Sequence, residues 1–126
     1  MLSMIVLYLR DVTLSSSLQS IGDYAFEGCG IRYITIPDNV TTIGKFAFND
    51  CPSLKITIGK SVISIGAIAF GDSSEHAIVA FSSKQPPKIE PFTFYKTVEL
   101  HVPKGYGDIY KKTEGWKNLN IIDDLE

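Results

Sequence analysis

Residues 21–70 contain the same six-residue motif three times: IGDYAF begins at Ile21, IGKFAF at Ile43 and IGAIAF at Ile65. The motif returns every 22 residues, and its isoleucine, glycine, alanine and phenylalanine positions do not change. Self-similarity at a fixed period of roughly 20 to 50 residues is typical of a solenoid, in which each unit buries its apolar side by stacking on its neighbours. The motif therefore predicts architecture more directly than chemistry.

Two further apolar columns extend this 22-residue register over five units. The first column is Val12, Ile34, Ile56, Ile78 and Leu100, and the second is Leu14, Ile36, Ile58, Ala80 and Val102. The alternation of apolar and polar residues within 34–36 and 56–58 predicts short strands with one buried face. Strands that run in the same direction at a constant offset form a parallel ladder, with neighbours about 4.8 Å apart.

The motif itself predicts the structure of each unit on the side opposite the strands. We expect the motif glycines to permit a backbone angle or a close approach that a side chain would block. The Ala-Phe segments are expected to form one helical turn on the outside, with the phenylalanine pointing inward. The register fails after Phe70, and Phe92 is predicted to continue the phenylalanine column in one more, distorted, turn.

The 126 residues form one domain by size. We expect an N-terminal edge at 1–10, repeats of about 22 residues at 11–103 and a C-terminal cap at 104–126. Within the cap, 105–112 should form a short helix with Ile109 and Tyr110 on its inner side. Residues 1–9 are apolar but lack the features of a signal peptide, so they are interpreted as part of the fold. No apolar run reaches the roughly 18 residues that a membrane span needs, so we expect no membrane insertion.

The net charge bears on the possible partners, and the two cysteines bear on possible covalent links. Twelve basic and 14 acidic residues give a net charge of -2, which offers no global field to attract nucleic acid. Cys29 and Cys51 lie 22 residues apart, at the same place in successive units. We expect two buried, unpaired thiols. A disulfide is the alternative, because stacked neighbours about 5 Å apart lie within disulfide range.

The residues 34–51 follow the pattern IxIPxxVxxIGxxAFxxC, which recurs with few changes from Ile56 to Phe70. This pattern resembles the BspA-like leucine-rich repeats of bacterial surface proteins. The ending, with Pro86-Pro87, LHVPKG from Leu100 and Gly115-Trp116, is similar to the closing segment of that family. The resemblance implies a right-handed leucine-rich-repeat solenoid, an α/β repeat with short parallel strands on one side and short helical turns on the other. It also implies a role in adhesion or in binding host or matrix proteins, and it transfers no catalytic residues.

A search for catalytic or metal-binding chemistry finds little. The only histidines are His76 and His101, and neither belongs to a zinc or protease motif. Glu99 and His101 share a strand face, but two ligands are too few for a structural zinc site. Ser73-Ser74 near His76 would need a third, orienting group to act as a nucleophile and base. We therefore predict no enzyme, no metal and no cofactor.

The outward side of the predicted ladder is the better candidate for a functional site. Between the buried columns lie the residues of a candidate protein-binding face: Tyr33, Thr35, Lys55, Thr57, Val79, Glu99 and His101. Aromatic residues among mixed polar groups are typical of protein interfaces. The alternative is that the threonines serve strand propensity alone. On the other side, Tyr24, Phe46 and Ile68 form an apolar column that is either partly buried between turns or a contact surface.

These observations predict a non-catalytic protein-binding module of a bacterial cell-surface or secreted protein, with adhesion to host or matrix proteins as its role. The alternative is a structural spacer or self-assembling unit without its own ligand, in which the N-terminal edge pairs with another copy to form a homo-oligomer.

Overall fold

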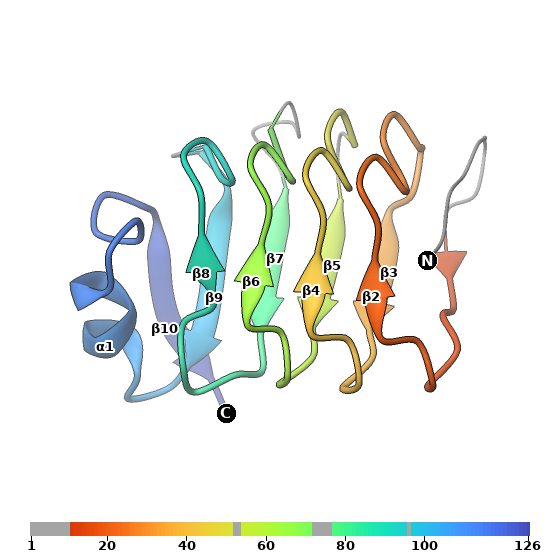
Figure 1. The fold of residues 1–126 in the computed structure, drawn as a ribbon. Coiled ribbons are helices and arrows are strands. Elements are labelled where there is room, and N and C mark those ends of the chain that lie inside the picture. The colour runs from red at the N-terminus through yellow and green to blue at the C-terminus, as the bar shows by residue number, and fades with distance from the viewer. Residues whose placement is uncertain (1–10, 52–53, 72–76, 96) are drawn as a thin grey trace.

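The computed structural model describes residues 11–51, 54–71, 77–95 and 97–126. Two parallel sheets lie back to back along the solenoid (Figure 1). The larger sheet has six strands in the order β1 (Asp11–Val12), β3 (Tyr33–Ile36), β5 (Lys55–Ile58), β7 (Ile78–Phe81), β9 (Glu99–Pro103) and β10 (Ile121–Leu125). The smaller sheet has four, in the order β2 (Ser20–Ile21), β4 (Thr42–Ile43), β6 (Ser64–Ile65) and β8 (Lys88–Ile89). The predicted parallel-strand solenoid is confirmed.

The predicted register holds between β3 and β5. Ile34 pairs with Ile56 and Ile36 with Ile58, and all four side chains are buried. The intervening residues of both strands are exposed, because successive side chains of a strand point to opposite faces. The isoleucine ladder therefore builds one wall of the core.

The register of β7 differs from the prediction by one residue. Ile56 pairs with Val79 and Ile58 with Phe81, so that 23 residues separate the paired positions instead of 22. A shift of one residue moves every side chain of a strand to the opposite face. Val79 and Phe81 are consequently buried, while Ile78 and Ala80 lie on the outward face. The next step, from Val79 to Leu100, takes 21 residues and restores the predicted alignment.

The motif phenylalanines form a continuous stack through the core. The ring of Phe48 lies 5.3 Å from that of Phe26 and 5.4 Å from that of Phe70. The next ring in the stack belongs to Phe94, 5.1 Å from Phe70. The prediction that Phe92 continues the column is wrong, because this unit is two residues longer: Ile89 pairs with Ile65, 24 positions earlier.

The motif segments are successive tight turns, so the predicted helical turns are wrong. The residue before each motif alanine has a positive φ: Tyr24 61°, Phe46 58°, Ile68 56° and Phe92 62°. Such residues cannot continue a right-handed helix. Alternate N–H groups instead bond to the neighbouring unit, as where Phe26 N–H donates to the Ala47 carbonyl at 2.8 Å. The motif glycines allow this close stacking: a Cβ on Gly44 would lie 2.4 Å from Asp23 Oδ1 and 2.6 Å from Asp23 N.

The C-terminal segment packs on the last units of the solenoid. Helix α1 (Gly107–Lys112) and β10 follow β9, and β10 pairs with β9 in parallel. Tyr110 and Trp116 are fully buried, with the Trp116 ring 5.3 Å from Phe81 and 5.7 Å from Phe94. Ile109 is exposed, so the predicted inner side of the helix is correct for Tyr110 alone. A capping role for 104–126 stays a prediction.

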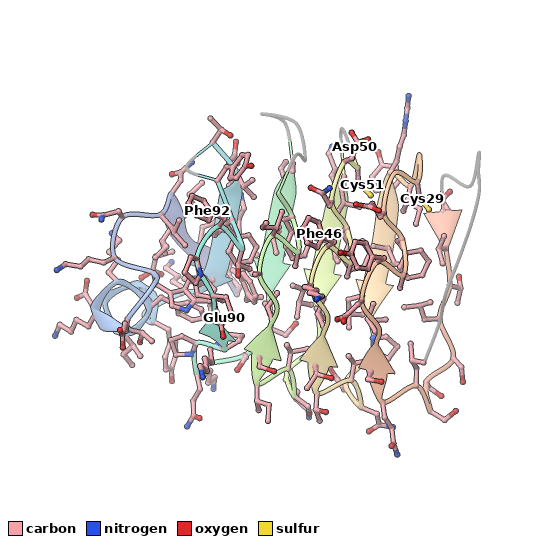
Figure 2. The ribbon with its side chains drawn as sticks, turned by 45° about the horizontal axis from the view of Figure 1, so that its top comes forward. Cys29, Phe46, Asp50, Cys51, Glu90 and Phe92 are labelled. Atoms are coloured by element: carbon pink, nitrogen blue, oxygen red, sulfur yellow. The ribbon has the colours of Figure 1, made fainter. Side chains whose placement is uncertain are left out.

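Cys29 and Cys51 are buried free thiols on neighbouring units, as predicted, and the alternative disulfide is not formed (Figure 2). The predicted N-terminal edge at 1–10, together with Ser73, Ser74 and His76, lies outside the described residues. Within the part of the chain that is described, no helix is long and apolar enough to cross a membrane.

Candidate protein-binding face

The N-terminal half of the candidate face is built by β3 and β5. Tyr33 and Thr35 project from β3, and Lys55 and Thr57 project beside them from β5, in the paired positions. All four side chains are exposed. Lys55 Nζ lies 5.7 Å from the centre of the Tyr33 ring, which is within the range of a cation–π contact. The sequence therefore identified this half of the face correctly as solvent-exposed.

The middle of the face differs from the prediction. Val79 is 0% exposed and belongs to the core, so it cannot contact a partner. Ile78 and Ala80, both half-buried, take the outward positions on β7. A signal for this exchange was present in the sequence: Phe81 occupies a position where three other units have Pro37, Gly59 and Pro103. A register that turns Phe81 inward buries a large aromatic side chain, which favours it by the area removed from water.

The C-terminal part of the face is a cluster of charged and polar groups on β9 and β10. His101 Nε2 lies 3.0 Å from Glu99 Oε1, and His101 Nδ1 lies 2.8 Å from Asp124 Oδ1. Burial of the ring lowers the pKa of His101, but hydrogen bonds and charge from Asp124 and Glu99 outweigh this and raise it above its usual value. Glu99 and His101 thus lie together as predicted, and Asp124 is a third member that sequence reasoning missed.

Asp124 was missed because β10 pairs with β9, and that pairing only forms in the folded chain. Strand β10 has two aspartates in succession, whose side chains point to opposite sides. Asp123 accepts hydrogen bonds from the Gly105 and Gly107 N–H groups at 2.7 and 2.9 Å, which holds the turn before α1. Asp124 faces the other way and reaches His101.

The apolar column on the turn side is partly buried. The rings of Tyr24 and Phe46 are stacked 4.9 Å apart and almost parallel, and Tyr24 is exposed along much of its surface. Phe46 and Ile68 are half-buried. Phe46 and Ile68 thus lie partly between successive turns, while a contact surface at this column stays a prediction.

Among the described residues, no group of three or more His, Cys, Asp or Glu side chains is arranged to hold a metal ion. What the outward face offers is an aromatic ring and an ammonium group at one end, a shallow apolar middle, and a carboxylate–imidazole cluster at the other end.

Comparison with protein families matches residues 6–112 to the BspA type leucine-rich repeat region, in six copies. The chain belongs to the BspA-type leucine-rich repeat family. BspA-type repeats are typically found in bacterial surface or secreted proteins, and leucine-rich repeats generally act as non-catalytic scaffolds for protein interactions. A search of curated proteins found no match.

Proposed function

We propose that this BspA-type domain is a non-catalytic protein-binding module of a bacterial surface or secreted protein, and that it acts in adhesion to host or matrix proteins. The single observation that carries the proposal is the row of exposed side chains on adjacent parallel strands, led by Tyr33 and Lys55. Tyrosine is among the residues that most often dominate binding energy at protein interfaces.

The backbone supports this role because it holds the face in one geometry. Tyr33 and Lys55 are anchored by Ile34 and Ile56, which are buried next to them and paired across the ladder. A partner that contacts such a face pays little to order it, since the strands are already fixed by the core. The proposed face comprises Tyr33, Thr35, Lys55, Thr57, Ile78, Ala80, Glu99, His101 and Asp124.

The test is a solid-phase binding assay with immobilised matrix proteins and a double variant, Tyr33→Ala with Lys55→Glu. We expect the variant to lose at least about tenfold in affinity, which corresponds to ~1.4 kcal/mol. The structure offers a matched control with the same two changes on the turn side, Tyr24→Ala with Lys45→Glu, because both residues are exposed there. The control should bind as the parent does.

Three results would contradict the proposal. Equal loss in both double variants would show that the binding depends on overall charge or stability. Loss in the turn-side variant alone would move the site to the turns. Absence of binding to any matrix protein would favour the spacer role.

A further inference from the structure

A groove lies at the C-terminal end of the small sheet, on the opposite side of the domain from the candidate protein-binding face. It has a volume of about 980 Å³ and is lined by β8, by the turns before and after β8, by 60–63 before β6, and by 113–115 and Leu119. We call it the C-terminal groove. Glu90 and Phe92, which belong to the turn after β8, line it (Figure 2).

The groove lies near the place where the two sheets end differently. The large sheet continues beyond β9 to β10, whereas the small sheet ends at β8 (Figure 1). After β9 the chain forms α1 and not a further motif turn. Residues 113–119 therefore lie next to β8 in place of a further motif turn: Trp116 Nε1 donates to the Pro87 carbonyl, and a Cβ on Gly115 would lie 3.0 Å from Ile89.

Three lysines, Lys60, Lys84 and Lys88, line the groove, and all three are exposed. Within the described part of the chain, no carboxylate lies within ion-pair distance of any of them; the ion pairs present there involve His101. Lys84 Nζ lies 5.6 Å from the centre of the Tyr106 ring, and a carboxylate of a ligand would have to compete with this cation–π contact. Glu90 and Glu114 also line the groove. Cations thus exceed anions at this place, in a chain whose net charge is -2.

The groove also presents apolar surface. Phe92 is 68% exposed, and Ile63 is exposed nearby on the groove wall. Phe92 has a φ of 62°, a conformation that L-residues other than glycine rarely adopt. Tyr24, Phe46 and Ile68 have the same conformation at the equivalent positions of the other turns, so the angle is a property of the repeat. Phe92 differs from them in being the most exposed of the four.

Buried hydrogen bonds hold the walls in place. Tyr110 OH donates to the Ser83 carbonyl at 2.6 Å, and Trp116 Nε1 donates to the Pro87 carbonyl at 3.0 Å. On the other side, buried Thr93 Oγ1 accepts a hydrogen bond from Glu90 N–H at 3.0 Å. Ligand sites are usually preformed in this way, with volumes of about 300–1,000 Å³.

We propose that the C-terminal groove binds a short extended segment of a partner protein in which acidic side chains flank an apolar one. The acidic side chains pair with Lys84 and Lys88, and the apolar side chain contacts Phe92. A protein segment fits better than single-stranded nucleic acid, because Glu90 and Glu114 would repel an unbroken row of phosphates. The site is separate from the strand face, so the proposal does not depend on the function proposed there.

The test uses fluorescence anisotropy with three labelled hexapeptides, which alternate glutamate with leucine, lysine with leucine, and glutamate with serine. A labelled oligothymidylate is the fourth probe. We expect the glutamate–leucine peptide alone to bind. Lys84→Glu with Lys88→Glu should weaken this binding at least about tenfold, because it replaces two attractive contacts by repulsive ones. Phe92→Asn should weaken it as well, and asparagine tolerates the positive φ, so the turn is preserved.

The matched control is Lys45→Glu with Lys111→Glu, which makes the same charge change at exposed positions away from the groove. It should bind the peptide as the parent does, and so should Tyr33→Ala with Lys55→Glu. Thermal melts of each variant confirm folding. The proposal is overturned if no peptide binds, if the oligothymidylate binds more tightly than the peptide, or if both charge-reversal variants lose binding equally.

Discussion

His101 Nδ1 lies 2.8 Å from Oδ1 of Asp124, a residue 23 positions further along the chain. This contact joins β9 to β10 on the outward face, and Glu99 approaches the second ring nitrogen at 3.0 Å. The neighbours of His101 on β7, including Ala80, carry no titratable group. The charge of the ring is therefore set by two carboxylates.

The first prediction concerns pH. The pKa of His101 is raised in the folded state, so the protonated ring stabilises the fold. That stabilisation is fully present below the unfolded pKa of about 6.5 and is lost as the pH rises through the folded value. The melting temperature of the parent should exceed that of His101→Gln by more at pH 5.5 than at pH 8. An NMR titration that places the His101 pKa below about 6.5 would contradict this prediction.

The second prediction tests the register of β7. Val79→Asp should abolish cooperative unfolding or lower the free energy of unfolding by several kcal/mol, because it buries an unpaired carboxylate. Ile78→Asp places the same group on the outward face and should cost much less. Urea denaturation followed by circular dichroism measures both. If Ile78→Asp is the more damaging change, Ile78 faces the core and Val79 faces outward, as the 22-residue period predicts.

The third prediction compares two glycines that serve different purposes. A Cβ at Gly28 would have nothing within 4 Å, but its φ is 71°, so Gly28→Ala should cost about 1–2 kcal/mol from the backbone alone. A Cβ at Gly44 would lie 2.6 Å from the Asp23 backbone nitrogen, and the stacked units would have to separate. Gly44→Ala should therefore lower the melting temperature more than Gly28→Ala does. Equal shifts would show that close stacking is not the reason for the motif glycine.

The fourth prediction concerns the thiols. Burial raises the pKa of Cys51 to about 12, and its Sγ donates a hydrogen bond to the Phe26 carbonyl at 3.2 Å. The reactive thiolate is therefore scarce at neutral pH. A thiol reagent should label neither cysteine quickly in the native protein, and should label both after denaturation without reductant. Rapid labelling of Cys51 in the native state would contradict its buried position.

Much of the fold could be predicted from local sequence, because the repeated motif constrains every unit in the same way. Ile34, Ile56, Phe48 and Gly44 each recur at a fixed offset, and a stack of similar units buries such columns by translation alone. The exposure of Tyr33 and Lys55 followed from the alternation of side chains along the same strands. These features depend on the period and on neighbours in the sequence.

Only the tertiary structure decided which side chains are buried where the length of the repeat changes. One additional residue before β7 places Ile78 and Ala80 on the outward face, where the sequence predicted Val79. Two additional residues before β8 place Phe94 in the ring stack, where the sequence predicted Phe92. An insertion of this kind can be absorbed in a loop or can shift a strand, and the choice depends on which side chains the assembled core can bury. Asp124 meets His101 for a similar reason: the pairing of β10 with β9 arises from long-range packing, which no local pattern in the sequence specifies.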